Sequence, residues 1–152
     1  MKPLSATLKK RLPMLHDKIV LGRKTLIDLI DFEMYGIVAK VDTGAYKNAL
    51  HCSKVEVVSD GKHKYLSFHV LDGEHPQYNN KLITVKNFSK TRVVNSFGHS
   101  QTRYVVTSRL RVHGIDDVFE AEFTLADRSQ LKAPILLGRK FLRHRFLVDV
   151  AS

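Results

Sequence analysis

The chain has 152 residues, enough for a single domain with a sizeable hydrophobic core. Its 43% hydrophobic and 26% charged residues exclude wholesale disorder, and no apolar run approaches the roughly 20 residues that span a bilayer. The net charge of +10 fits a solubility surface or a polyanionic partner, either an acidic peptide or nucleic acid.

The first predicted segment, residues 1–17, is basic but lacks the apolar stretch of a secretory signal. We predict a poorly ordered or covering leader here, followed by one domain over residues 18–152. The single cysteine, Cys52, excludes an internal disulfide and is weakly typical of a reducing compartment. We therefore expect a cytoplasmic protein.

Residues 37–52, IVAKVDTGAYKNALHC, contain the pattern richest in chemistry. An apolar run leads into Asp42, Thr43 and Gly44, so a carboxylate stands at the end of a buried strand. The Thr43 hydroxyl can bond the backbone and fix the loop. Gly44 allows a sharp turn and the close approach of another chain. The pattern predicts a carboxylate on the floor of a cleft, although these residues also suit a turn without activity.

The middle of the chain predicts short strands joined by turns. A hairpin is expected around residues 59–62, and residues 72–80 form the most loop-like stretch, with Gly, Pro and two Asn. Further short strands are expected at residues 81–86 and 91–97.

The last third predicts a regular hairpin and then the only helix. In residues 118–125 apolar and polar side chains alternate, which is typical of a half-buried strand. Residues 103–112 give its partner strand, and Gly114 in the turn is free to take a positive φ. Residues 138–146 carry a short helical stripe. The chain thus predicts an all-β barrel or sandwich with one short C-terminal helix.

Two segments resemble retropepsin-like aspartic proteases: VDTGAYKNAL at 41–50 resembles the catalytic loop, and APILLGRKFLRHRFLVDV at 133–150 resembles the strand that ends in Gly-Arg. Residues 22–29, 93–106 and 123–129 also resemble a bacterial family labelled ATP-dependent zinc protease. That family is described as retropepsin-like and is associated with ATP-grasp glutamate ligases. The resemblance implies a closed acid-protease-like β-barrel.

The words of that label do not match the residues of this chain. The sequence has no GxxxxGK[ST] phosphate loop and no HExxH zinc motif. His63 and His69 can share a strand face, but no carboxylate or cysteine partner accompanies them. We expect neither a metal nor a cofactor.

The mechanism that the resemblance implies needs two carboxylates, one activating water and one polarising the scissile carbonyl. The chain carries one Asp-Thr-Gly, so the resemblance implies a C2 homodimer in which the two Asp42 side chains meet and Thr43 bonds across the axis. Gly44 completes the catalytic loop, and Ala45 is assigned to substrate binding.

His99 and Arg103 lie in another segment that resembles the family pattern. From the residues alone they are a turn histidine and an exposed arginine. If they are functional, they bind substrate carboxylates, with Arg103 acting bidentately.

Gly138, Arg139 and Asp149 are predicted to be structural. Retroviral enzymes carry an acidic residue after Asp-Thr-Gly-Ala, whereas this chain has Tyr46. Arg139 is therefore expected to pair with another acid, either Asp149 or Asp127. Retroviral flaps are glycine-rich, but the turns at 59–64 and 72–80 offer one glycine each, so the sequence does not identify the covering segment.

We therefore predict a homodimeric aspartic endopeptidase that hydrolyses peptide bonds through paired Asp42. The ligase association suggests acidic or glutamyl-tailed substrates, and the positive charge is compatible with them. The alternative is a catalytically silent peptide-binding barrel. A nucleic-acid-binding barrel rests on charge alone, and no association with a membrane is expected.

Overall fold

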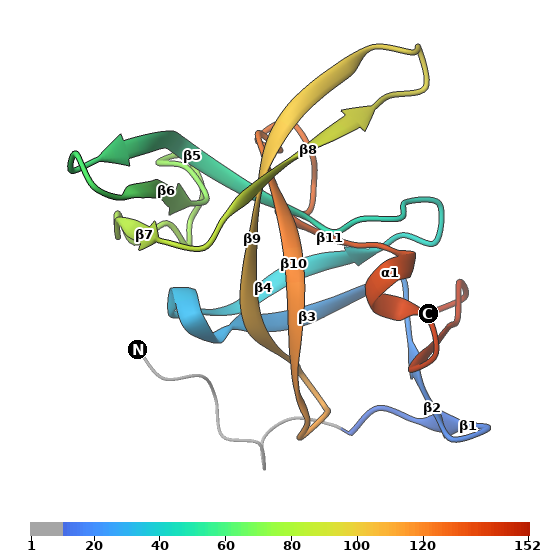
Figure 1. The fold of residues 1–152 in the computed structure, drawn as a ribbon. Coiled ribbons are helices and arrows are strands. Elements are labelled where there is room, and N and C mark those ends of the chain that lie inside the picture. The colour runs from blue at the N-terminus through green and yellow to red at the C-terminus, as the bar shows by residue number, and fades with distance from the viewer. Residues whose placement is uncertain (1–10) are drawn as a thin grey trace.

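The structure, a computed structural model, describes residues 11–152 and consists mainly of β-strands (Figure 1). Three strands form a small sheet in the order β1 (Met14–Leu15), β2 (Lys18–Leu21), β12 (Phe146–Val148). Nine strands form the second sheet: β3 (Lys24–Leu29), β4 (Met34–Val41), β5 (Ala49–Ser59), β6 (Lys64–Val70), β7 (Ile83–Val85), β8 (Ser89–Val94), β9 (Ser100–Val112), β10 (Val118–Ala126) and β11 (Ile135–Leu137). The described helices are a 3-10 turn, η2 (Ile30–Phe32), and one α-helix, α1 (Arg139–Leu142).

The larger sheet closes on itself. Its strand order runs β10, β9, β3, β4, β11, β5, and a parallel pairing of β5 with β10 joins the two ends. β6 and β7 continue outward from β5, and β8 pairs with β9 outside the ring, so the sheet is not a strict barrel. The prediction of an all-β fold with one short C-terminal helix is confirmed.

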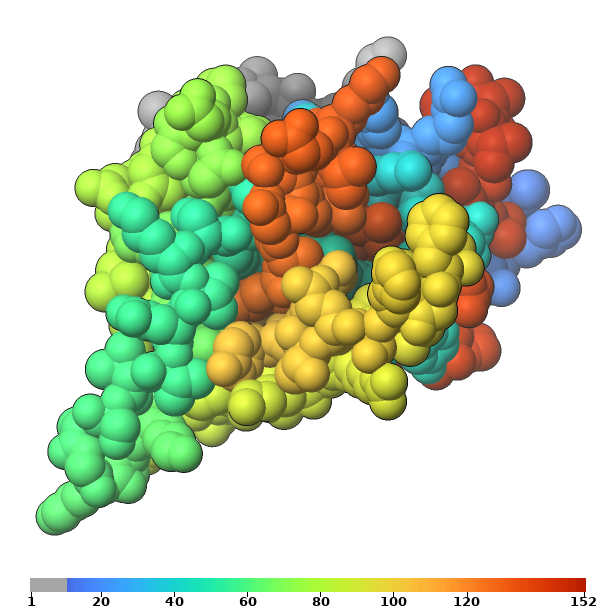
Figure 2. Space-filling view, turned by 90° about the horizontal axis from the view of Figure 1, so that it is seen from above, coloured from blue at the N-terminus to red at the C-terminus, as the bar shows by residue number. Residues whose placement is uncertain are grey.

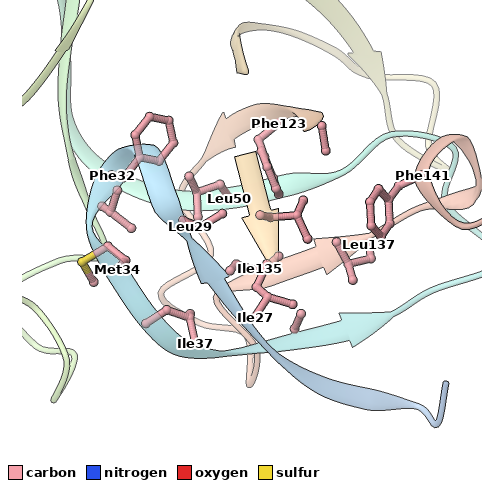
Figure 3. Close-up of a cluster of buried hydrophobic side chains, with 14 of the residues drawn as sticks. Ile27, Leu29, Phe32, Met34, Ile37, Leu50, Phe123, Ile135, Leu137 and Phe141 are labelled. Atoms are coloured by element: carbon pink, nitrogen blue, oxygen red, sulfur yellow. The ribbon is translucent and has the colours of Figure 1, made fainter. Parts of the chain in front are cut away.

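The core fills the inside of this ring. Figure 3 shows apolar side chains from β3, β4, β5, β10 and β11 pointing toward one another. Phe32 meets Phe68 edge-on, with ring centroids 5.4 Å apart, which suits the charge distribution of aromatic rings. In β4 burial alternates, with Ile37, Ala39 and Val41 inside and Lys40 exposed. This alternation carries the chain from the core directly to Asp42.

The turns follow the glycine pattern. Gly61 in the β5–β6 hairpin has φ +93°, and Gly114 in the β9–β10 hairpin has φ +95°. An L-residue adopts such angles at a cost, so both predicted hairpins use glycine where the backbone requires it.

The structure describes only residues 11–17 of the predicted N-terminal leader. Residues 1–10 lie outside the described residues, and Met14–Leu15 pairs antiparallel with β2. None of the helices in residues 11–152 is long and apolar enough to cross a membrane.

Candidate active site

Asp42 follows β4 and is held by its own loop. Its backbone N–H donates to the carbonyl of Leu137 at 2.9 Å, and its Oδ1 accepts the N–H of Gly44 at 2.9 Å. Asp42 is half-buried, whereas Thr43 and Gly44 are exposed. The loop therefore presents an oriented carboxylate close to the surface.

Gly44 serves this loop for a different reason from the one predicted. Its φ does not lie in the left-handed region, so no sharp turn requires glycine here. A Cβ at this position would stand 3.1 Å from Asp42 Oδ1. The predicted turn is present at residues 43–44, but its backbone does not require glycine, and the absent side chain leaves room for the carboxylate.

The end of β11 packs directly on the Asp42 loop. The N–H of Arg139 donates to the carbonyl of Ala45 at 2.8 Å, and the N–H of Lys140 donates to that of Tyr46 at 2.9 Å. A Cβ on Gly138 would stand 2.6 Å from the Tyr46 carbonyl oxygen. Only glycine permits this approach, which supports the structural role predicted for Gly138.

Asn48 locks the same contact and was missed by the sequence reasoning. Its side-chain oxygen accepts the N–H of Gly138 at 2.9 Å, and its amide donates to the Glu122 carbonyl at 2.9 Å. Its own carbonyl accepts the Thr124 hydroxyl at 2.9 Å. The signal was present, because Asn48 is a polar residue at the entry of a buried strand, where a polar group needs partners.

The ion pair predicted for Arg139 is wrong. Arg139 Nη1 donates to the Thr43 carbonyl at 3.1 Å, and the guanidinium lies 5.7 Å from the centroid of the Tyr46 ring. Asp149 accepts the N–H of Ala151, and Asp127 accepts Ser129. An aromatic face attracts a cation, so Tyr46 takes the place of the missing acid.

Arg128 was also missed, although it lies in one of the segments that carry the resemblance. Its backbone N–H donates to His51 Nδ1 at 2.9 Å, and its Nε donates to the Ala133 carbonyl at 3.1 Å. Burial lowers the pKa of the Arg128 guanidinium, and the positive charge of Arg103 lowers it further, while Asp42 acts in the opposite direction. The Arg128 charge therefore lies within electrostatic reach of both Arg103 and Asp42.

Behind Arg128, a buried histidine joins two loops. His51 Nε2 lies 2.6 Å from Asp72 Oδ2, while Nδ1 accepts the Arg128 N–H. In the neutral ring the proton is therefore on Nε2 and is donated to Asp72. The neighbouring Cys52 is buried, and burial raises the pKa of its thiol, which is typical of a structural, unreactive cysteine.

This histidine contact makes stability depend on pH. The hydrogen bond from His51 holds the pKa of Asp72 below its ordinary value of about 3.9, helped by the N–H of Glu74. A carboxylate whose pKa is lower in the folded state than in the unfolded state stabilises the fold at pH values above its unfolded-state pKa. This stabilisation is lost as the pH falls through the folded-state pKa. We expect Asp72→Asn to lower the free energy of unfolding near neutral pH and to lower it less at about pH 3. Urea unfolding at both pH values measures this, with Asp117→Asn as control; an equal loss at the two pH values would contradict it.

His99 and Arg103 lie on the β8–β9 hairpin. His99 is exposed in its turn, where the Asn95 side chain accepts the N–H groups of Phe97 and His99. Arg103 is half-buried, donates to Gln101 at 3.2 Å, and lines a cavity of ≈ 470 Å³. The outer part of this hairpin extends beyond the pairing of β9 with β10. Figure 2 shows it in yellow, beside the orange segment that contains Arg128.

The two histidines considered for a metal have other neighbours. The His63 ring lies edge-on to Tyr65, and His69 Nδ1 lies 3.3 Å from the Tyr78 hydroxyl. Across residues 11–152 no group of three or more His, Cys, Asp or Glu side chains could hold a metal ion.

The sequence of this chain is similar to a known protein family and to several known proteins. The model of the RimB-like family, described as "Retropepsin-like aspartic endopeptidase RimB", matches residues 20–152. A protein of Parasynechococcus marenigrum described as "Probable alpha-L-glutamate ligase" is 30% identical over 136 residues, 87% of this chain and 28% of its own length. A protein of Shewanella pealeana with the same description is 27% identical over 140 residues, 90% of this chain and 29% of its own length. The chain thus spans less than a third of these relatives.

The fold also matches that of a solved structure. The protein Lpg0085 of Legionella pneumophila, of unknown function, aligns with a TM-score of 0.67 and 23% identity, covering 88% of this chain and 94% of its own. At this identity the match concerns the fold alone.

Proposed function

Because the chain belongs to the RimB-like family of retropepsin-like aspartic endopeptidases, we propose that it is a peptidase whose active site forms between two copies of the chain. The predicted family and its all-β retropepsin-like fold are confirmed by this membership. Catalysis, dimerisation and substrate are our proposals.

The observation that carries this function is the Asp42 loop itself. One carboxylate is oriented by Gly44 and by the end of β11, and its loop is exposed at Thr43 and Gly44. The sequence contains a single Asp-Thr-Gly, so a second Asp42 must come from another copy. An exposed loop is accessible to that copy, which would place both carboxylates at a two-fold axis.

Two adjacent carboxylates then take different catalytic roles. Like charges at close range favour a state in which the pair holds one proton. The ionised Asp42 removes a proton from water, and the protonated one donates a hydrogen bond to the carbonyl oxygen of the scissile bond. The water oxygen adds to the carbonyl carbon as this proton is removed, and the proton then passes to the leaving amine when the C–N bond breaks.

Mixing subunits tests the shared site. Adding an equal amount of Asp42→Asn subunits to wild type is expected to lower peptidase activity to about half, because random pairing leaves each wild-type subunit a competent partner half of the time. Release of a fluorogenic peptide measures this after subunit exchange. Unchanged activity in a protein shown to exchange subunits would contradict a site made from two chains.

Several observations support an acidic substrate. Arg128 is half-buried, lies within electrostatic reach of Asp42 and donates to a neutral carbonyl, and Arg103 adds a second positive charge. A desolvated cation gains from a carboxylate partner more than an exposed one does. The net charge of +10 and relatives described as glutamate ligases agree with a glutamyl segment as substrate.

Arg128 therefore becomes a test of specificity. We expect Arg128→Gln to lower kcat/KM about 10- to 100-fold for peptides with glutamate beside the scissile bond, and much less for peptides with glutamine there. Arg128→Lys should lie between them, since lysine keeps the charge but loses the fork of donors. The matched control is Arg11→Gln, which removes an exposed arginine paired with Asp116. An equal loss on both peptides would assign Arg128 to structure.

We also propose that the β8–β9 hairpin covers the bound peptide, in place of the turns at 59–64 and 72–80. Its turn carries Gly98 at φ +80° and a Phe97 side chain that is 82% exposed. Thr91 on β8 accepts a hydrogen bond from Lys47, which connects the hairpin to the Asp42 loop. An exposed aromatic ring beside a glycine suits a segment that closes over a ligand.

A further inference from the structure

A second cavity begins where the Asp42 loop ends. It has a volume of ≈ 510 Å³ and lies between β8, β10, α1 and the residues that lead into β5. Its charged lining residues are Lys47, Lys90, Lys140, Arg145, Glu120 and Glu122. Hydroxyl groups of Ser89, Thr91 and Thr107 line it as well.

The charges in this cavity do not cancel. Lys140 Nζ pairs with Glu122 Oε1 at 2.7 Å, and this contact raises the pKa of Lys140. Arg109, which does not line the cavity, forms a salt bridge with Asp31 that raises the pKa of Arg109, and Glu120 adds to this effect. The four lining cations therefore outnumber the two lining carboxylates, and Lys47, Lys90 and Arg145 remain beyond the Lys140–Glu122 pair.

Those remaining cations have neutral neighbours. Lys90 Nζ lies 5.6 Å from the centroid of Tyr104, and the Arg145 guanidinium lies 5.2 Å from that of Phe119. Lys47 donates to the Thr91 hydroxyl. Rings and hydroxyls orient these side chains without neutralising them, and the described residues give none of the three a salt bridge to a carboxylate. The cavity is therefore prepared for an anion.

Its position connects it with Asp42. Lys47 and Asn48 follow the Asp42 loop directly, and Asn48 holds Gly138 at the end of β11. Lys90 lies on β8, one strand of the hairpin that we expect to cover the substrate. An extended peptide that leaves Asp42 along this side would reach Lys47 first.

We propose that this cavity is a subsite that binds the carboxylates of an acidic peptide segment at some distance from the scissile bond. The proposal rests on the proposed peptidase function and extends it to substrate residues that do not react. Lysine ammonium groups on flexible stems can donate to carboxylates at varied spacing, so the subsite suits a run of acidic residues better than one fixed group. Its affinity must fall with salt because the cations are partly exposed.

Binding to a catalytically silent protein tests the subsite separately from cleavage. The probe is a fluorescein-labelled peptide of six glutamates, titrated with the full-length Asp42→Asn protein at low and moderate salt and followed by fluorescence anisotropy. In this background Lys47→Gln with Lys90→Gln is expected to weaken binding about tenfold and to reduce its salt dependence. The matched control, Lys62→Gln with Lys64→Gln, removes two exposed lysines from the β5–β6 hairpin and should leave binding unchanged.

Each outcome decides one question. Equal affinities of the two double variants would overturn the subsite, and so would tighter, Lys47- and Lys90-dependent binding of a single-stranded oligonucleotide, which would assign the cavity to nucleic acid. Thermal unfolding checks both variants, and Arg145→Gln replaces the lysine pair if that pair does not fold. If wild type cleaves no glutamate peptide but binds it through these lysines, the peptidase function fails and the binding site stands. If wild type cleaves and the lysines do not matter, only the subsite fails.

Discussion

Replacing Asp42 with asparagine is expected to abolish peptide cleavage and to leave the fold intact. Asparagine has nearly the same shape, and its side-chain oxygen can still accept the Gly44 N–H. It cannot take a proton from water, so the dimer loses its general base and the proton that two carboxylates share. We expect cleavage to fall by about 10³-fold or more. Mass spectrometry of a mixed peptide pool that includes glutamate-tailed peptides measures this from acid to neutral pH.

The control for this experiment is Asp117→Asn, an exposed aspartate in the β9–β10 turn. It removes the same charge and should keep wild-type activity. Circular dichroism and thermal unfolding establish that both variants are folded. If Asp42→Asn cleaves as wild type does, the Asp-Thr-Gly segment is a structural turn. If neither wild type nor Asp117→Asn cleaves any peptide, a silent peptide-binding module becomes the better interpretation.

Gly138→Ala is expected to destabilise the protein by about 3 kcal/mol. A Cβ at this position would stand 2.6 Å from the Tyr46 carbonyl oxygen and 2.7 Å from that of Lys47. Both are backbone atoms, so neither can rotate away, and β11 must separate from the Asp42 loop. That separation also weakens the hydrogen bond from Gly138 to Asn48. Urea unfolding followed by circular dichroism measures the change in the free energy of unfolding.

Gly73→Ala is the matched control, because a Cβ there meets no atom within 4 Å and the backbone is not left-handed. Its effect should stay within about 0.5 kcal/mol. Similar stability of the two variants would show that β11 and the Asp42 loop can separate at little cost. In that case the contact would not orient Asp42 in the way that we infer.

The fold was predictable where the pattern is local. Alternation over residues 118–125 gave the buried face of β10, with Ala121, Phe123 and Leu125 buried as expected. Gly114 marked the turn before it. The Asp42 position was predictable for the same reason, since an apolar strand and the turn that follows it are neighbours in sequence.

The partners of the charged groups were not predictable in this way. Arg139 contacts the carbonyl of Thr43 and the ring of Tyr46, whereas charge matching favoured an acid. Arg128 reaches His51 across 77 positions of sequence, and no short motif records such a contact. Asn48 and Gly138, which lock the Asp42 loop, are separated by 90 positions.

Local patterns along the chain suffice to predict an all-β protein with a carboxylate at the end of a buried strand. Alternation and turn chemistry act over a few residues, so they can be read along the chain. The tertiary structure decided which groups surround that carboxylate: the end of β11 beneath it, Arg128 within reach of its charge, and Lys47 leading into a basic cavity. Closure of the sheet brings these distant segments together. The burial of Arg128 and the short distances between these charges exist only after folding.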